Sequence, residues 1–381
     1  MDDDRPAGMS YGSIAGQRSM ALDHSRNRAY ARALEAVVTP ESVVLDPGAG
    51  TGILGLMAAR LGARRVYLVE PEDVMAVTRE IVQANGLASR VVCLQGRMQQ
   101  VALPEPVDII VSALTGNFLL TEDLGDLLLL ARDRALKPGG QMLPSEAVME
   151  VVPVSAPALH DREIAAWSIP EQAVDLSPAR AYAANTIFYR SKEIGEAEWL
   201  ADPVDLQAYD FGRDSQLAVH TAVSCEVRQS GLCHGWVGWF RMRLADRWLS
   251  TSPREAPLHW APAFLPVDPP IRLREGETVT LGLDREPRGD WAWRMTAEQG
   301  GRSHSTLLSM PLSETALAYA APDFRPPPSG MAQAVVAILT ACDGTRTIET
   351  IAREIHARFP AQVPTADEAL RLVQAVSRRY A

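Results

Sequence analysis

The stretch from residue 43 to residue 70, VVLDPGAGTGILGLMAARLGARRVYLVE, constrains the fold more than any other part of the sequence. It starts with a short apolar run, 43–45, which suits a buried parallel strand. Pro47 prevents a helix from starting directly after this strand. Residues 53–61 then follow a helical pattern, and residues 65–69 form a second apolar run. This order predicts a strand, a glycine turn, a helix and a second strand.

Three closely spaced glycines and two carboxylates in this stretch indicate a cofactor site. Gly48, Gly50 and Gly52 allow the chain to turn tightly and a ligand to approach the backbone. Their GxGxG spacing differs from the GxGxxG of dinucleotide enzymes, which argues against a pyrophosphate. Asp46 and Glu70 end the two strands, and an acid at the second position can hold a ribose with two hydroxyls. The pair favours S-adenosylmethionine, with an ordinary tight turn as the alternative.

The composition excludes several classes of function. A chain of 381 residues with 47% hydrophobic residues is long enough for two or three domains. Its net charge of −10 opposes general nucleic-acid binding, which needs clustered Lys and Arg. An acidic N-terminus and the lack of a long apolar run predict neither export nor a membrane anchor, hence a cytoplasmic protein. The cysteines have no CxxC spacing, so we expect neither a metal site nor disulfides: Cys93, Cys225, Cys233 and Cys342.

The alternation of helices and strands continues to about residue 144 and predicts one α/β domain. An amphipathic pattern at 20–37 precedes the first strand and is placed to cover the cofactor like a lid. The strand at 107–111 delivers residues 112–117 to the same edge of the sheet as the glycine turn, so we expect active-site residues there. The other predicted elements are helices at 74–84 and 124–135 and strands at 91–94 and 141–143.

Two further units follow. Residues 145–310 contain alternating apolar and polar segments, which predict a β-rich domain with strands at 148–154, 218–227, 236–244 and 278–283. Within it, residues 160–203 have weak strand character and are interpreted as a projecting interaction arm. The proline-dense segment 321–329 predicts a joint, and 331–340, 348–359 and 366–380 predict three helices within a third unit, 311–381. We keep two interpretations of this unit: a recognition domain, and a cap that stabilises the β domain.

Over residues 10–310 the chain resembles the protein arginine methyltransferases. VVLDPGAGTGIL resembles the family's cofactor motif, VDIIVS the strand before its catalytic loop, and LLLLARDRALKPGGQMLP the segment after that loop. In the other domain, STSP followed by Leu258-His259-Trp260 resembles the family's Thr-His-Trp loop, with Leu in place of Thr. The resemblance implies an α/β plus β fold: a Rossmann-like class I methyltransferase domain and a β-barrel domain with an arm through which two copies dimerise.

The resemblance also implies a site for S-adenosylmethionine, with S-adenosylhomocysteine as the product. It places Arg26 against the cofactor carboxylate, although the sequence alone favours a solvated charge there. Gln99 stands where the family has a Glu directed toward the adenine amine, and Tyr11 matches an aromatic residue that closes the pocket. The implied cofactor residues are Tyr11, Arg26, Asp46, Gly48, Gly50, Glu70 and Gln99.

The catalytic loop departs from the family. The family has two glutamates here, but this chain keeps only the second, Glu122, and has Ala113 in place of the first. A guanidinium keeps its proton at neutral pH, and removing one partner of a buried charge pair costs about 3–5 kcal/mol. The small loop around Asn117 therefore favours a neutral acceptor: an amide, imidazole, hydroxyl or thiol. The implied catalytic residues are Ala113, Asn117, Glu122 and His259. As an alternative, Ala113 marks an enzyme that has lost its activity. As an alternative for His259, its side chain only holds the loops together.

The C-terminal sequence ILTACDGTRTIETIAREIHARFP resembles the small winged-helix domain related to the pyrroloquinoline-quinone peptide chaperone. That family implies capture of a precursor's leader peptide by strand addition. Our leading hypothesis is a methyltransferase that modifies a peptide side chain, in the biosynthesis of a ribosomally synthesised natural product (RiPP), with the leader held by this tail. The second hypothesis keeps arginine as the acceptor. The third is a peptide-binding scaffold without catalysis.

Overall fold

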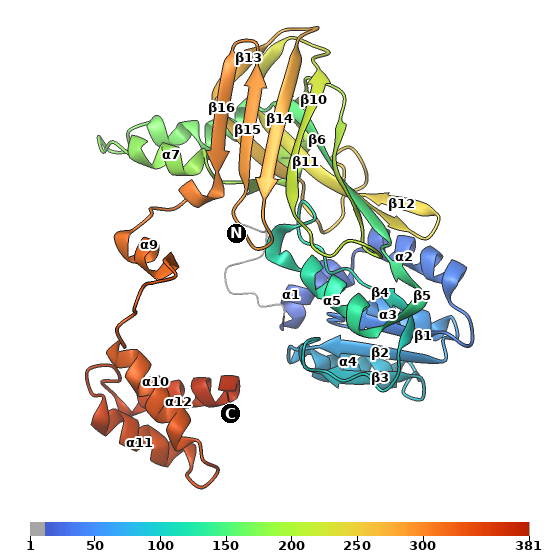
Figure 1. Cartoon of the computed structure of the whole chain (residues 1–381), viewed down its shortest axis with the longest axis vertical. Helices are drawn as coiled ribbons and strands as arrows, with labels where there is room; N and C mark the ends of the chain where they lie inside the picture. Colours follow the sequence, from blue (N-terminus) through green and yellow to red (C-terminus); the bar gives the residue numbers. More distant parts are fainter. Residues whose placement is uncertain (1–11, 381) are drawn as a thin grey trace. The chain divides into compact units, whose positions relative to one another are not determined.

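The computed structural model describes residues 12–380 (Figure 1). The chain divides into two compact units, Met1–Pro311 and Leu312–Ala381, and each is described by itself. The first unit contains an α/β domain and a β domain that share one continuous apolar core. Among the described residues no helix is long and apolar enough to cross a membrane.

The α/β domain is built around a five-stranded parallel sheet with the order β3-β2-β1-β4-β5. The strand order reverses between β1 and β4, so a crevice is expected beyond their carboxyl ends. The elements are α1 (Ile14–Ala21), α2 (His24–Val37), β1 (Val43–Pro47), α3 (Ile53–Arg60), β2 (Arg65–Glu70), α4 (Val74–Ala84), β3 (Val91–Gln95), β4 (Val107–Val111), the 3-10 turn η1 (Thr121–Asp123), α5 (Gly125–Ala135) and β5 (Leu136–Leu143).

Two details of this domain differ from the sequence predictions. The helix predicted at 20–37 is interrupted, because Asp23 caps α2: its Oδ1 accepts a hydrogen bond of 2.9 Å from the Arg26 N–H. The predicted range includes only the last two residues of the preceding helix, α1. The last strand was predicted at 141–143, but β5 begins at Leu136, and the register of its pairing with β4 shifts between Val107 and Ile109.

The β domain consists of two antiparallel sheets, one with the order β10-β14-β15-β16 and one with the order β7-β13-β11-β6-β8, which β9 and β12 extend. The expected closed barrel is not confirmed, because no ladder joins the two sheets among the described residues. The strands are β6 (Glu146–Ser155), β7 (Phe188–Tyr189), β8 (Glu198–Trp199), β9 (Val204–Asp210), β10 (Val219–Glu226), β11 (Gly231–Leu244), β12 (Arg247–Ser250), β13 (Ala263–Leu273), β14 (Thr278–Arg285), β15 (Ala292–Ala297) and β16 (Gly300–Ser305).

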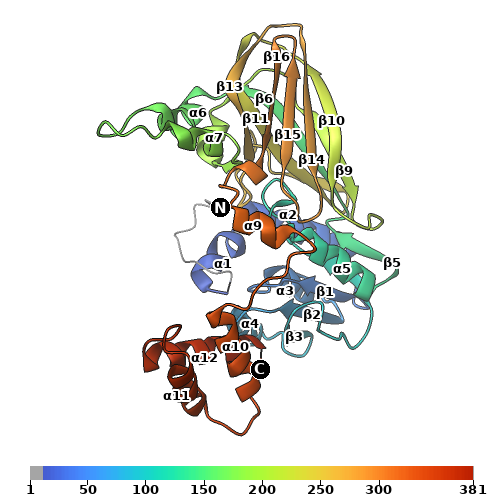
Figure 2. The ribbon, with the colours of Figure 1, turned by 60° about the vertical axis from the view of Figure 1, so that its left-hand side comes forward.

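The predicted arm is a helical projection from the β domain (Figures 1 and 2). Its tip carries exposed apolar side chains, including Ile169, Val174 and Leu176. At its base, the Asp268 carboxylate accepts hydrogen bonds from Arg180 Nε and Nη2, and lies 3.0 Å from His160 Nε2. Its helices are α6 (Pro157–Glu163), η2 (Ala165–Ser168), η3 (Ser177–Ala179), α7 (Arg180–Ala183) and α8 (Ser191–Gly195).

The C-terminal unit is helical. The 3-10 turn η4 (Thr306–Leu308) precedes it, and it contains α9 (Glu314–Ala320), α10 (Gly330–Ala341), α11 (Ile348–Arg358) and α12 (Ala366–Tyr380). The last three helices enclose a small core of their own around Ile338, Ile351 and Val373. The three helices were predicted, but residues 312–380 contain no strand, so the wing of a winged helix is not confirmed.

Candidate active site

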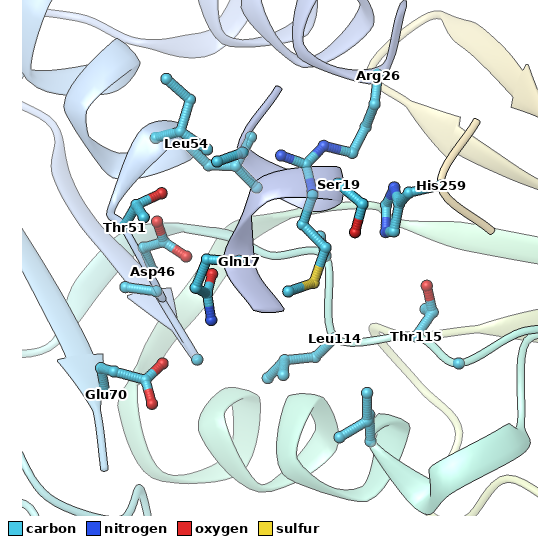
Figure 3. Close-up of a pocket in the computed structure, with 18 of the residues that line it drawn as sticks. Gln17, Ser19, Arg26, Asp46, Thr51, Leu54, Glu70, Leu114, Thr115 and His259 are labelled. Atoms are coloured by element: carbon cyan, nitrogen blue, oxygen red, sulfur yellow. The ribbon is translucent and has the colours of Figure 1, made fainter. Parts of the chain in front are cut away.

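A cavity of ≈ 320 Å³ opens at the carboxyl ends of β1 and β4. Asp46, Thr51 and Glu70 lie on one side of it and Thr115 and His259 on the other, with Gln17 between them (Figure 3). The first group comes from the glycine turn and its strands, and the second comes from the loop after β4 and from the β domain. One cavity therefore connects the predicted cofactor residues with the predicted catalytic residues.

The glycine turn is held by the two carboxylates that flank it. Gly48, Gly50 and Gly52 have φ angles of +67°, +52° and +79°, a region that favours glycine. Glu70 Oε2 accepts a hydrogen bond of 2.9 Å from the Gly50 N–H, and Asp46 Oδ2 accepts one of 2.9 Å from the Gly55 N–H. Glycine at these positions thus shapes the loop as a cradle.

Burial changes the acidity of both carboxyl groups. Burial raises the pKa of Asp46 to about 7, and the nearby charge of Glu70 acts in the same direction. Burial also raises the pKa of Glu70, against the hydrogen bonds that it accepts from the N–H groups of Glu72 and Gly50. A cationic ligand beside these groups would favour their ionised forms, and S-adenosylmethionine carries both a sulfonium and an ammonium group.

Arg26 is a buried cation at the edge of the same cavity. Its side chain comes from α2, the residue is only 3% exposed, and burial lowers its pKa. Nε and Nη2 donate to Asn27 Oδ1 at 3.1 and 2.8 Å, but no carboxylate within residues 12–380 forms an ion pair with it. A buried guanidinium of this kind fits the carboxylate of an amino-acid cofactor.

The loop after β4 is folded back on itself. The Gly116 N–H donates to Leu119 O at 3.0 Å, and a Cβ atom at Gly116 would lie 1.7 Å from Thr121 O. The backbone therefore pinches at Gly116 and Thr121, and Glu122 follows with a φ angle of 72°. Ala113 and Glu122 both line the cavity. The loop thus brings Glu122 to the same cavity as the glycine turn.

His259 and Trp260 bring the β domain into the site. Asp23 Oδ2 accepts a hydrogen bond of 2.9 Å from the His259 backbone N–H and lies 2.9 Å from His259 Nδ1. Burial raises the pKa of Asp23, but these contacts and the hydrogen bond from the Arg26 N–H outweigh it and hold the pKa low. Trp260 Nε1 donates to Thr115 O at 2.9 Å, so the two loops are fixed against each other.

Comparisons with known proteins match this arrangement in two consecutive segments. The family described as ribosomal protein L11 methyltransferase (PrmA) matches residues 23–146. The arginine methyltransferase oligomerization subdomain matches residues 145–295. The trypanosome complex described as "Trypanosoma brucei PRMT1 enzyme-prozyme heterotetrameric complex with AdoHcy" superposes with a TM-score of 0.72 at 26% identity, covering 78% of this chain and 99% of that one.

In sequence and in fold, the chain is similar to the protein arginine methyltransferases. Protein arginine methyltransferase 10 of Arabidopsis thaliana superposes with a TM-score of 0.67 at 25% identity, over 78% of this chain and 99% of that one. Histone-arginine methyltransferase CARMER of Drosophila persimilis is 28% identical over 292 residues, or 71% of this chain and 53% of that protein. The probable CARMER protein of Drosophila melanogaster matches to the same extent. The chain spans about half the length of these curated relatives.

Most of the residues predicted to bind S-adenosylmethionine surround this cavity. Arg26, Asp46, Gly48 and Glu70 line it, whereas Gly50 does not line it and packs against the Gln17 side chain. Tyr11 lies outside the described residues. Among the residues that the structure describes, no group of three side chains that could hold a metal ion occurs.

Two predicted site residues have surroundings that differ from those of the others. Gln99 was predicted to face the adenine, but it is exposed beyond β3 and does not line the cavity. Asn117 was predicted to be catalytic; it lines the cavity, but its Oδ1 accepts a hydrogen bond of 2.9 Å from the Ala261 N–H and so joins the two loops. A position in a sequence motif does not by itself determine where a side chain points.

Sequence reasoning missed the contribution of α1. Gln17 is buried, and a Cβ atom at Gly50 would lie 2.3 Å from Gln17 Oε1. Ser19 and Met20 also line the cavity, so α1 forms part of its wall. Ser13 at the start of this helix was the available signal: its side chain accepts a hydrogen bond of 3.0 Å from the Gly16 N–H, as an N-cap does.

Proposed function

We propose that this chain transfers a methyl group from S-adenosylmethionine to a side chain of a peptide or protein. The observation that carries the proposal is the single cavity that Arg26, Asp46 and Glu70 share with Glu122 and His259. The matched relatives are named as arginine methyltransferases, which supports a peptide or protein as the substrate. When bound, the cofactor supplies an electrophilic methyl group on a sulfonium.

The residues of the chain provide binding, positioning and a proton acceptor. Arg26 holds the cofactor carboxylate, and Glu70 holds the ribose. Glu122 accepts a hydrogen bond from the acceptor group and takes its proton, while His259, whose ring is oriented by Asp23, forms the opposite wall. Positioning of the two reactants in line supplies much of the rate enhancement, as is usual for a displacement between bound groups.

The acceptor that we propose is uncharged. Ala113 lines the cavity at the position of the first family glutamate, and Glu122 is the only acid between residues 112 and 122. A buried guanidinium that lost one of two carboxylate partners would be destabilised by about 3–5 kcal/mol. One carboxylate is sufficient for a neutral amide, imidazole, hydroxyl or thiol.

Arginine N-methylation is the second candidate, favoured by the names of the relatives and by the retained Glu122 and His259. Methylation of arginine and non-arginine peptides by the wild type and by Ala113→Glu distinguishes the two. An uncharged acceptor predicts that Ala113→Glu raises arginine methylation and lowers the native activity. Efficient arginine methylation by the wild type would contradict it.

A peptide-binding scaffold without catalysis is the third candidate, and calorimetry excludes or supports it directly. A methyltransferase binds S-adenosylhomocysteine, and Asp46→Ala or Glu70→Ala weakens that binding. If the wild-type protein shows no heat of binding for S-adenosylhomocysteine, only the hypothesis of a scaffold without catalysis remains.

We further propose that the C-terminal unit captures the leader of a RiPP precursor peptide, as its resemblance implies. Support comes from its independent core and from a groove of ≈ 650 Å³ between α10 and α11, lined by Val336, Thr340, Ile355 and Arg358 among others. Because residues 312–380 contain no strand, the groove replaces strand addition as the mode of binding.

Tethering raises the local concentration of the acceptor residue. Deletion of residues 320–381 should lower turnover at limiting peptide, and unchanged turnover would remove this role.

Two properties of the whole protein complete the proposal. The exposed apolar tip of the arm supports a homodimer, in line with the oligomerization subdomain that matches residues 145–295. The four cysteines are free, which supports a reducing, cytoplasmic location. Analytical ultracentrifugation of the wild type and of a variant with Ile169→Asp and Val174→Asp tests the dimer; a wild-type monomer would contradict it.

A further inference from the structure

The side-chain hydroxyl of Thr115 is buried and forms no hydrogen bond with any described residue. Thr115 is 5% exposed and lines the cavity, and among residues 12–380 its Oγ1 has no hydrogen-bond partner. The side-chain oxygen points toward the His259 side of the cavity (Figure 3). Native proteins pair nearly all such atoms, because an unpaired buried hydroxyl is costly. The partner of this one is therefore expected to be a ligand.

The fold of the loop brings the backbone at Thr115 close to the backbone at Glu122, and both residues line the cavity. Gly116 and Thr121 approach so closely that no side chain fits between them. Thr115 directly precedes the first of these residues, and Glu122 directly follows the second. A hydrogen bond of 2.8 Å from the Thr115 N–H to Ala113 O also turns the chain tightly, which keeps Thr115 beside the position where the family has its other carboxylate.

We propose that Thr115 and Glu122 together recognise a primary carboxamide, the side chain of asparagine or glutamine. This inference rests on the proposed methyl transfer and names its acceptor. Glu122 accepts a hydrogen bond from the amide nitrogen, and the Thr115 hydroxyl donates one to the amide oxygen. A guanidinium has N–H donors only, so it could donate to the Thr115 oxygen but would leave the buried O–H donor of Thr115 without an acceptor. An imidazole nitrogen that attacks the methyl group uses the lone pair that Thr115 would need.

The pairing also suits the chemistry of an amide, which is a weak nucleophile until it loses a proton. Glu122 removes one N–H proton, and the negative charge that develops on the amide oxygen is stabilised by the Thr115 hydroxyl. The nitrogen lone pair then forms the N–C bond to the methyl carbon while the C–S bond breaks, and sulfur keeps that electron pair. The products are an N-methyl carboxamide, S-adenosylhomocysteine and one proton, which passes from Glu122 to water.

The test uses the full chain and peptides of one sequence that carry Asn, Gln, Arg, His or Ser at one central position. Methylation is read by mass spectrometry for the wild type, Thr115→Val and Thr115→Ser, with Thr296→Val on the exposed face of β15 as the matched control. We expect methylation of the Asn or Gln peptide. Thr115→Val should lower kcat/KM by roughly 10-fold or more, and Thr115→Ser should restore it. S-adenosylhomocysteine binding, measured by calorimetry, should be the same in all variants.

Thermal unfolding of the same variants without substrate provides a second readout. Thr115→Val keeps the shape of the side chain and removes only the unpaired hydroxyl, so its Tm should equal or exceed that of the wild type. A lower Tm would show that the hydroxyl has a structural partner, which overturns the inference. Unchanged kcat/KM in Thr115→Val, or methylation of Arg, His or Ser in place of the carboxamide, would also overturn it while methyl transfer itself stands. A wild type that methylates no peptide would remove the proposed function and this inference together.

Discussion

Arg26 provides the sharpest prediction about the cofactor, because it is a buried cation that forms no ion pair with a described carboxylate. In the complex we expect its guanidinium to bind the carboxylate of S-adenosylhomocysteine. Arg26→Met would leave that carboxylate desolvated without a partner, at a cost of about 3–5 kcal/mol. Since 1.4 kcal/mol corresponds to a factor of ten, Kd should rise by about 100- to 4,000-fold. Titration calorimetry with S-adenosylhomocysteine measures this directly.

The same variant should have little effect on folding. Removing the guanidinium relieves its desolvation, which offsets the loss of its hydrogen bonds to Asn27 Oδ1. Urea unfolding of the free protein checks this, so weak binding cannot be attributed to misfolding. Arg28→Met is the matched control, because Arg28 is exposed on the same helix. A Kd for Arg26→Met within about threefold of the wild type would refute the assigned contact.

Three further predictions follow from the geometry of the site. The pKa of Asp46 is raised from 3.8 to about 7 in the folded protein. The free energy of unfolding of the cofactor-free protein should therefore fall as the pH rises from about 4 to about 7. In urea unfolding, Asp46→Asn should make the free energy of unfolding less dependent on pH over this range. Asp23→Ala removes the cap of α2 and both contacts to His259, and should lower the free energy of unfolding by about 2–4 kcal/mol in the same assay. Gly116→Ala places a Cβ atom 1.7 Å from Thr121 O, and should lower kcat by about 100-fold or more while calorimetry shows unchanged cofactor binding.

Each of these predictions has a control or a clear contrary outcome. For Asp46→Asn, a pH dependence as steep as that of the wild type would show that another group titrates. For Asp23→Ala, an unfolding midpoint equal to that of the wild type would mean that the capping contacts contribute nothing. Gly195→Ala is the control for Gly116→Ala, because its Cβ atom would meet nothing closer than 3.8 Å. Equal activities of the two alanine variants would contradict the tight pinch of the loop.

The cofactor cradle was predictable from sequence because its determinants are local. The β1 strand, the glycines and the α3 helix follow one another directly, and a parallel pairing of β1 with β2 brings Asp46 and Glu70 to the same edge. The three C-terminal helices were predicted for the same reason, since each shows its own apolar periodicity. The absence of wing strands there could not be anticipated from helical patterns.

Contacts between distant segments could not be predicted from the sequence. Asp23 and His259 are 236 residues apart, and no periodic pattern links a helix cap to a loop of the β domain. The same holds for Gln17, which reaches the glycine turn from a helix with little apolar periodicity. The unpaired hydroxyl of Thr115 is likewise visible only when its surroundings are known.

Transfer of a labelled methyl group to a peptide is the most direct measurement of what this chain does. The wild-type protein would be incubated with methyl-deuterated S-adenosylmethionine and a precursor peptide encoded beside its gene, and the product sequenced by tandem mass spectrometry. We predict the label on an uncharged side chain, a carboxamide according to the arrangement of Thr115 and Glu122. Label on arginine would contradict the acceptor that we infer from Ala113, and no label on any residue would contradict methyl transfer itself.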